Sequence, residues 1–236
     1  MLLNYAVQTL RAIFSGRLYG RILALAILTW VGNPPVSLAA TLPVSESPAA
    51  EQRMKEGLHL LQQGDFAQAT SSWREAARLY EAEQKFSQQS SALVHVAQAY
   101  QAIGQYRDAV QNLESALALA EKSNDRAQVA IALGTLGNVY LATGPAETAR
   151  KYLDEGLRLA RELKNQDISA IILNNLGNLL TRQKKYSEAL AAYKESLSLA
   201  SARNNHALVT TALINAATAS TNINQHKEAK ALLDKA

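Results

Sequence analysis

Residues 136–157 read LGNVYLATGPAETARKYLDEGL, and residues 176–197 read LGNLLTRQKKYSEALAAYKESL. The second stretch begins forty residues after the first, and both place a glycine, an alanine and large aliphatic residues at the same positions. Self-similarity at such a period indicates a solenoid built from repeated supersecondary units. Alanine, leucine, glutamine and glutamate dominate the chain, and these helix formers predict an all-α protein.

The period runs through five turn segments, which begin at residues 64, 104, 144, 184 and 224. A small residue precedes each turn, at Gly57, Ala97, Gly137, Gly177 and Ala217, and an alanine follows it, at Ala69, Ala109, Ala149, Ala189 and Ala229. We expect these small residues to let two antiparallel helices approach closely, while Trp73 and Leu153 fill the grooves. One hairpin cannot bury its apolar stripe alone, so neighbouring hairpins must stack.

With these motifs the chain resembles the tetratricopeptide repeat family from about residue 51 to the end. The forty-residue period, in place of the usual 34, is similar to the kinesin-light-chain type. The resemblance implies an α-solenoid of stacked antiparallel helix hairpins, wound as a right-handed superhelix.

The turn signals predict an array over residues 49–236. Its repeats are expected at about 49–86, 87–125, 126–165 and 166–205, with an incomplete one at 206–236. We predict helices at about 49–63, 66–83, 88–103, 106–123, 126–143, 146–164, 168–183, 186–203, 206–223 and 226 to the end.

Three residues are predicted to cap helices: Ser47, with Pro48 at the first helical position, Asp125 and Asp167. The fifth hairpin stops within its second helix, which would leave Leu232 and Leu233 with nothing to cover them. Finished arrays normally end with a polar capping helix. This ending therefore indicates a truncated product, a fragment or the start of a longer protein.

The first forty residues have the order of a targeting segment. Arg11, Arg17 and Arg21 precede an apolar run over residues 22–31 and then small residues. Ten apolar residues are too few to span a bilayer, which needs roughly 20, but they suit a signal-peptide core. We predict a cleaved signal peptide over 1–39, a linker over 40–48, and an exported protein, periplasmic or secreted. An uncleaved membrane anchor at 22–31 and a chance apolar helix stay open as alternatives.

The resemblance also implies a binding face, because in this family the residue after the small one points into the concave groove. Asn174 lies one helical turn before Asn178, on the same face. Amides donate and accept, so they can pair with a peptide backbone without selecting its side chains. The alternative is that the asparagines join neighbouring repeats. The candidate groove residues are Gln98, Gln101, Asn138, Asn174, Asn178, Arg182 and Thr218.

Family members that clamp acidic chaperone tails place a lysine one turn before the groove asparagine. Here that position holds no cation, which argues against such a clamp; its residues are Met54, Val94, Gly134, Asn174 and Ile214. Apart from the three N-terminal arginines, 21 basic residues face 20 acidic ones, and no basic patch for nucleic acid is seen.

No pattern of catalytic or metal-binding residues appears. The chain has no cysteine, and its four histidines are spread over different repeats. We therefore expect no enzymatic activity, no cofactor, no metal and no small-molecule substrate, and membrane contact only through an uncleaved signal. The expected partner is a protein or peptide, held by a scaffold. The alternative is a sensor half of a larger protein, because exported forty-residue repeats often resemble the CHAT group, in which a caspase-like domain follows.

Overall fold

The computed structural model describes residues 47–236; the predicted signal peptide and most of the predicted linker lie outside the described residues. The described residues form ten α-helices and no strand, and each helix lies within two residues of its predicted start. The helices are α3 (Pro48–Gln62), α4 (Phe66–Ala82), α5 (Phe86–Ala102), α6 (Tyr106–Lys122), α7 (Arg126–Thr143), α8 (Ala146–Glu162), α9 (Gln166–Arg182), α10 (Tyr186–Ala202), α11 (His206–Asn222) and α12 (His226–Leu233).

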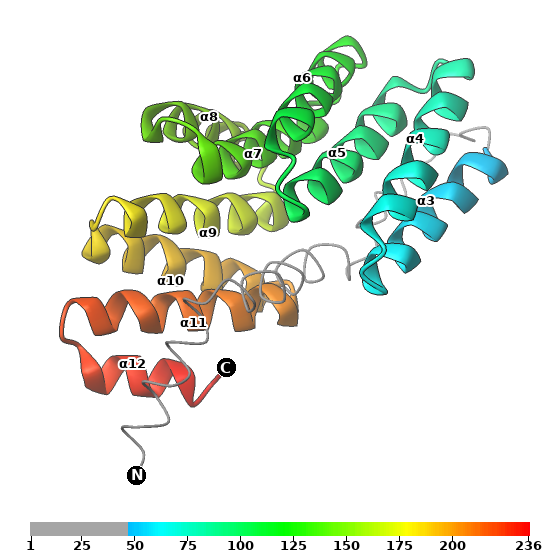
Figure 1. Ribbon diagram of the computed structural model, residues 1–236. Coiled ribbons are helices and arrows are strands. Elements are labelled where there is room, and N and C mark those ends of the chain that lie inside the picture. The colour runs from blue at the N-terminus through cyan, green and yellow to red at the C-terminus, as the bar shows by residue number, and fades with distance from the viewer. Residues whose placement is uncertain (1–46) are drawn as a thin grey trace.

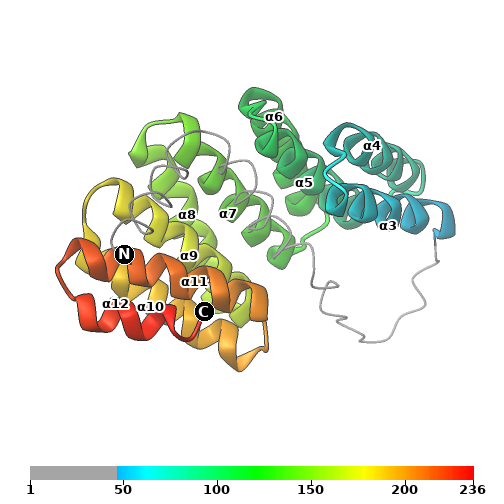
Figure 2. The same ribbon diagram turned by 60° about the horizontal axis from the view of Figure 1, so that its bottom comes forward.

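Each odd-numbered helix packs against the even-numbered helix that follows it, and the resulting hairpins stack along a curve (Figure 1). The odd-numbered helices of neighbouring hairpins also contact one another, α5 with α7, α7 with α9 and α9 with α11. The even-numbered helices of the described chain make no comparable contacts among themselves. The odd-numbered helices therefore line the inside of the curve, and Figure 2 shows the same succession of pairs from a second side. We call them the inner helices and the others the outer helices.

The turns between helices repeat every twenty residues. Eight of them pass through the left-handed region, at Gly64, Gln84, Gly104, Asn124, Lys164, Lys184, Asn204 and Asn224. This conformation ends a helix sharply and is the usual C-terminal device of α-helices. The exception is Gly144, whose φ of −106° and ψ of 176° are extended. Pro145 follows it, and a proline pushes the preceding residue toward extended backbone.

Close helix contacts occur at the predicted small residues. A Cβ atom built on Gly57 would lie 2.4 Å from the Trp73 ring, and one on Gly177 would lie 2.4 Å from the Tyr193 ring. A Cβ on Gly137 would lie 2.6 Å from Cγ of Leu153. Real carbon atoms pack at about 3.5–4.0 Å, so only glycine fits at these three positions without rearrangement. The predicted packing of a small residue against a large one is seen at these three positions, but not at the fifth hairpin, where Leu233 is exposed.

The hydrophobic core is continuous along the stack. The predicted alanines after the turns are buried, with 0% exposure at Ala69, Ala109, Ala149 and Ala189 and 5% at Ala229. Each core cluster combines residues of successive hairpins, as where Leu153 of α8 packs with Ile172 of α9. The hairpins therefore share one interior, which is why a single hairpin would not be stable alone.

Of the three predicted caps, Asp125 is right, Asp167 is wrong, and Ser47 holds the N-cap position without a cap hydrogen bond. The side chain of Asp125 accepts the backbone N–H of Gln128 at 3.0 Å. Asn165 caps α9 by accepting the N–H of Ile168, because the twenty-residue turn spacing places the cap two residues before Asp167. Ser47 precedes Pro48 as predicted but makes no cap bond; its hydroxyl donates to Glu83 instead.

Leu232 and Leu233 are predicted to have nothing to cover them, and this holds for Leu233 alone. Leu233 is 54% exposed. Leu232 is buried in the cluster that contains Leu213 and Ala217 of α11, so the expectation that nothing covers it is wrong. The eight residues of α12 place one of the two leucines against the preceding helix. No helix among the described residues has both the length and the apolarity to cross a membrane.

Candidate partner-binding face

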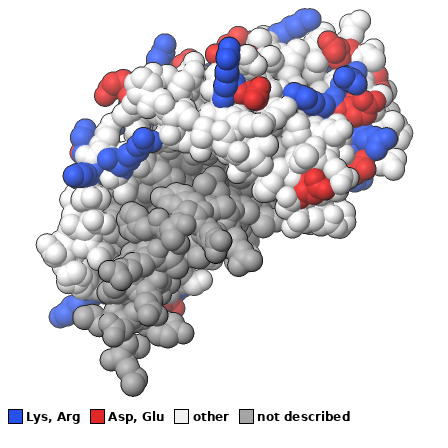
Figure 3. All heavy atoms as spheres, in the orientation of Figure 1, with Lys and Arg blue, Asp and Glu red and all other residues white. Residues whose placement is uncertain are grey.

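Four of the five inner helices carry almost no charge, whereas α3 has Glu51, Arg53, Lys55 and Glu56. In α5 and α11 there is no Asp, Glu, Lys or Arg, and α7 has only Arg126 at its first position. In α9 the only charged residues are Asp167, near the start, and Arg182, at the end. Charges concentrate on the outer helices, and on the face shown in Figure 3 the basic and acidic side chains are interspersed. A ligand of the inner face would therefore be recognised by amides and hydroxyls rather than by ion pairs.

The largest amide cluster joins α9 to α11. The Nδ2 atom of Asn215 donates to Oδ1 of Asn174 at 3.0 Å and to Oδ1 of Asn178 at 3.4 Å. Oδ1 of Asn178 also accepts the Tyr193 hydroxyl at 2.8 Å. That hydroxyl lies 3.1 Å from the Thr181 hydroxyl. Two of the predicted groove residues are thus brought together, in a network that spans two neighbouring hairpins.

Burial raises the pKa of Tyr193 to about 12, while the hydrogen bond with Thr181 lowers it. The phenol is therefore neutral at pH 7 and can donate its proton to Asn178. Its ring is 2% exposed and packs over Gly177. Tyr193, held in the core of the fourth hairpin, thereby fixes the position of the Asn178 amide on the inner face through its hydrogen bond.

A second, smaller cluster lies on α5 and α7. Nδ2 of Asn138 is 3.5 Å from Oε1 of Gln101, one hairpin earlier. On α5, the ring Nδ1 of His95 lies 3.1 Å from Oε1 of Gln98, and the ring stacks on Trp73 at 5.1 Å. Burial lowers the pKa of His95 to about 4, although the bond with Gln98 opposes this shift. His95 therefore adds no charge to this part of the face at pH 7.

Two predicted residues lie outside these clusters. Thr218 donates its hydroxyl to the carbonyl of Ile214 within its own helix. Arg182 is exposed and lines a cavity near the turns instead. Among the described residues no side-chain hydrogen bond joins Asn138 to Asn178, so the expected register of amides is divided into two groups.

Asn215 was missed by sequence reasoning. It lies three residues before Thr218, on the same side of the helix, and its amide is the bond donor that links both α9 asparagines. The periodic pattern carried a weak signal, because Asn175 occupies the equivalent position forty residues earlier.

The α9 cluster leaves hydrogen-bond donors available. Asn174 and Asn178 both use Oδ1 in the network, whereas neither Nδ2 atom has a hydrogen bond to a described residue. A side-chain amide nitrogen carries two N–H donors. The chemistry that fits such donors is a set of carbonyl oxygens, as an extended polypeptide backbone presents them.

No metal site is apparent in residues 47–236, which contain no group of three histidine, aspartate or glutamate side chains suited to hold an ion. Some ion pairs on the outer helices link neighbouring hairpins, as Arg161 with Glu195 at 2.6 Å and Lys194 with Glu228 at 2.5 Å, and others lie within one helix. Exposed pairs of this kind contribute about 0–1 kcal/mol. They indicate solvated surface rather than a reaction centre.

A family model described as tetratricopeptide repeat matches the chain at residues 88–162, 128–202 and 168–236. The three matches start forty residues apart, in agreement with the period of the sequence. None of the curated proteins compared with the chain matches it.

Several solved structures share the fold. A Rap protein complexed with competence and sporulation factor has a TM-score of 0.70 at 17% identity, over 81% of this chain and 54% of that one. The Rap conjugation gene regulator of plasmid pLS20, in complex with the Phr* peptide, has a TM-score of 0.65 at 16% identity, over 84% and 57%. The repeats of a putative kinesin light chain from Podospora anserina give 0.59 at 17% identity, over 81% and 94%. At these identities the likeness shows the fold alone, and the chain spans about half of each Rap protein.

Proposed function

The chain belongs to the tetratricopeptide repeat family, and we propose that it is a non-enzymatic scaffold whose inner face binds an extended polypeptide segment. The observation that carries this proposal is the pair of unused amide donors on α9, at Asn174 and Asn178. They lie on the part of the inner face that α5, α7, α9 and α11 form, which has almost no charge. Backbone carbonyls of a partner would satisfy them without requiring particular side chains.

Two further points support a polypeptide ligand. The near absence of charge on α5, α7, α9 and α11 disfavours nucleic acid, which is bound chiefly through cationic contacts to phosphate. The structurally similar pLS20 regulator is complexed with a peptide. We extend that mode of binding to this chain as part of the proposal.

The experiment uses isosteric variants that remove the donors and keep the network. In Asn174→Asp and Asn178→Asp, a carboxylate oxygen can still accept from Asn215 and Tyr193, but the Nδ2 donors are lost. Peptides selected from a random display library on the wild-type protein serve as probes, and calorimetry measures their affinity. Each lost hydrogen bond should cost about 0.5–1.5 kcal/mol, so the double variant should bind roughly 5- to 150-fold more weakly.

Glu155→Ala is the matched control, because Glu155 is exposed on an outer helix. It should bind the same peptides as tightly as the wild type. Circular dichroism must show unchanged helix content in every variant. Equal affinity of the wild type and the double aspartate variant would assign the asparagines a structural role and leave the binding face elsewhere.

We also propose that the protein is exported and that residues 1–39 are removed. The support is the order of the N-terminal sequence, three arginines followed by an apolar run and small residues. Mass spectrometry of the protein isolated from its native cells should find an N-terminus at Ala40 or Thr41. Recovery of an intact Met1 from a cytoplasmic fraction would contradict export.

A further inference from the structure

A cavity of about 250 Å³ lies beside the turn of the third hairpin, where α7, α8 and α9 meet. Tyr140, Leu141, Gly144 and Ala146 form one side of it, and Leu179, Arg182 and Gln183 form the other. This volume is below the roughly 300–1,000 Å³ of sites for drug-sized ligands. The cavity therefore suits a single side chain or a small molecule of that size.

The cavity lies at the turn where the repeat pattern has no ring. The first residue of each outer helix is Phe66, Tyr106, Ala146, Tyr186 and His226 in order. The third hairpin alone has a methyl group there. Leu179 is larger than Ala99, the equivalent residue two hairpins earlier. The leucine side chain nevertheless does not fill the cavity.

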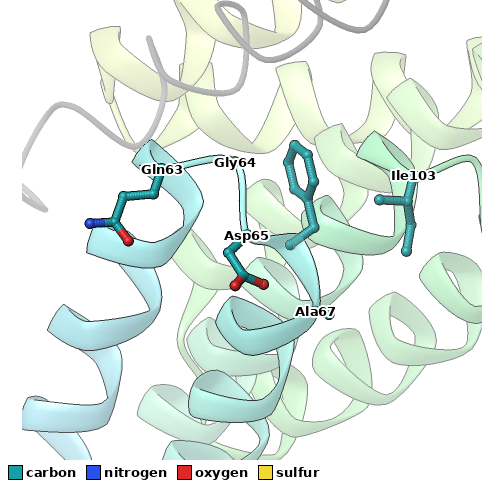
Figure 4. A pocket seen from close by; sticks show the side chains of 6 residues that line it. Gln63, Gly64, Asp65, Ala67 and Ile103 are labelled. Atoms are coloured by element: carbon teal, nitrogen blue, oxygen red, sulfur yellow. The ribbon is translucent and has the colours of Figure 1, made fainter.

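The equivalent place between the first and second hairpins shows the difference (Figure 4). Gly64, Phe66 and Ile103 stand there in the positions of Gly144, Ala146 and Gln183, eighty residues later. That depression is larger, about 470 Å³, but it is broad and open to solvent, whereas the cavity of the third hairpin is more enclosed. Between the third and fourth hairpins, a methyl group and an amide thus replace the ring and the isoleucine found between the first and second.

The walls of the cavity are fixed. The Tyr140 ring stacks on Tyr152 with centroids 5.5 Å apart. A Cβ on Gly144 would lie 2.6 Å from Cδ1 of Tyr140, so the extended Gly144–Pro145 turn lies directly against this ring. A preformed aromatic wall favours another ring, which can stack or meet it edge to face.

Two polar groups in the lining have no partner among the described residues. Oε1 of Gln183 is buried and accepts no hydrogen bond, and a buried acceptor without a donor is costly. Arg182 is exposed and makes no ion pair with any described residue. A ligand that satisfies both needs a donor on its buried end and a negative charge at its outer end.

We propose that this cavity binds the side chain of a tyrosine supplied by a partner polypeptide. The ring takes the place of the ring that the third hairpin lacks. Its hydroxyl donates to Oε1 of Gln183 once the side-chain amide turns toward the cavity, because that oxygen is buried in the unbound protein. A carboxylate of the same partner segment pairs with Arg182. The site is formed by residues other than those of the amide clusters and does not depend on the function proposed for them.

The test uses the full chain and 3-(4-hydroxyphenyl)propionate, which combines a phenol with a carboxylate. Amide shifts in a ¹H–¹⁵N NMR titration should move at Tyr140, Ala146 and Gln183, with a dissociation constant on the order of 1 mM for a probe of this size. The matched probe 3-phenylpropionate lacks the hydroxyl and should bind roughly 2- to 10-fold more weakly.

Three variants separate the contacts. Ala146→Phe restores the ring found in the other hairpins and should abolish binding. Gln183→Leu should bind both probes equally, and Arg182→Ala should weaken both carboxylate probes while leaving p-cresol unaffected. The double aspartate variant at Asn174 and Asn178 should bind p-cresol as the wild type does, because this probe has no carboxylate to compete with the new carboxylate at position 178 for Arg182. Failure of one proposal is therefore distinct from failure of the other.

Two outcomes would overturn the proposal. One is the absence of shifts at these residues with 20 mM probe, which would mean that the cavity holds only water. The other is a Gln183→Leu variant that still prefers the phenol, which would show that the hydroxyl does not reach this amide. Because the second result does not depend on the folding of Ala146→Phe, the proposal stays testable if that variant is unstable.

Discussion

Gly137→Ala offers a sharp test of the packing, because two known effects of this substitution have opposite signs. Replacing glycine by alanine inside a helix normally stabilises it by about 1 kcal/mol. Here the added Cβ would lie 2.6 and 2.7 Å from Cγ and Cδ2 of Leu153, and 3.2 Å from its backbone nitrogen. Carbon atoms at rest pack about 3.5–4.0 Å apart, so the leucine or the whole of α8 must move by roughly 1 Å.

Leu153 has no exposed surface, so it has no free space to move into. Overpacking of this kind costs about 1–3 kcal/mol, which exceeds the gain in helix propensity. We therefore expect Gly137→Ala to lower the free energy of unfolding by about 1 kcal/mol. Urea denaturation followed by circular dichroism at 222 nm measures it through the shift in midpoint.

A double-mutant cycle identifies the cause. Leu153→Ala alone should cost about 2–5 kcal/mol through the space it leaves, but it removes Cγ and Cδ2, the two atoms closest to the new Cβ. In that background Gly137→Ala should be neutral or stabilising. Two results would show that the helix contact does not require Gly137. One is a stabilising effect of Gly137→Ala in the wild type. The other is a double variant whose loss of stability equals the sum of the two single losses within about 0.5 kcal/mol.

Two other predictions concern single residues. Tyr193→Phe should lower stability at pH 7 by about 1 kcal/mol through its lost hydrogen bonds, and this deficit should shrink above pH 10. The folded-state pKa of Tyr193 is raised to about 12, whereas the pKa of an unfolded tyrosine is near 10. The neutral hydroxyl therefore stabilises the folded state fully below pH 10, and this stabilisation is lost as the pH rises toward 12. Unfolding midpoints of the wild type and the variant that fall in parallel from pH 7 to 11.5 would contradict this. Lys184→Gly should raise the free energy of unfolding by about 1 kcal/mol. Lys184 has a φ of 61°, and this left-handed conformation costs residues other than glycine roughly that amount. A lower thermal midpoint of the variant would contradict the prediction.

The fold could be predicted because its information is local and repeated. Gly137, Gly177 and the alanines after the turns specify close helix contacts within one hairpin, and the same information recurs every forty residues. The error at Asp167 was also local. Asn165 and Asp167 are both suitable caps, and the choice between them depends on where the preceding left-handed turn ends, at Lys164.

The candidate site could be predicted only in part. Asn174 and Asn178 were placed together from their helical spacing, but their common partner Asn215 lies 41 and 37 residues further along the chain. That contact depends on how α9 and α11 approach, which no short motif specifies. The cavity was not predicted at all, since the replacement of a ring by Ala146 gains meaning only when the neighbouring Gln183 is seen to lie against it. The resemblance to the CHAT group stays a prediction, because it concerns sequence beyond the repeats.

The regular spacing of the turns has a consequence for how such a protein can evolve. Each hairpin occupies forty residues without insertion, so duplication or loss of one such unit in the gene would return every later turn to its proper place. The inner face would then lengthen or shorten by one helix, and the segment it spans would change in length in fixed steps. The hairpin with Gly144–Pro145 would move as a unit too, and its cavity would move with it only together with the next hairpin, which supplies Leu179, Arg182 and Gln183. Unequal recombination could therefore change the number and order of contacts offered to a partner while each contact kept its own geometry.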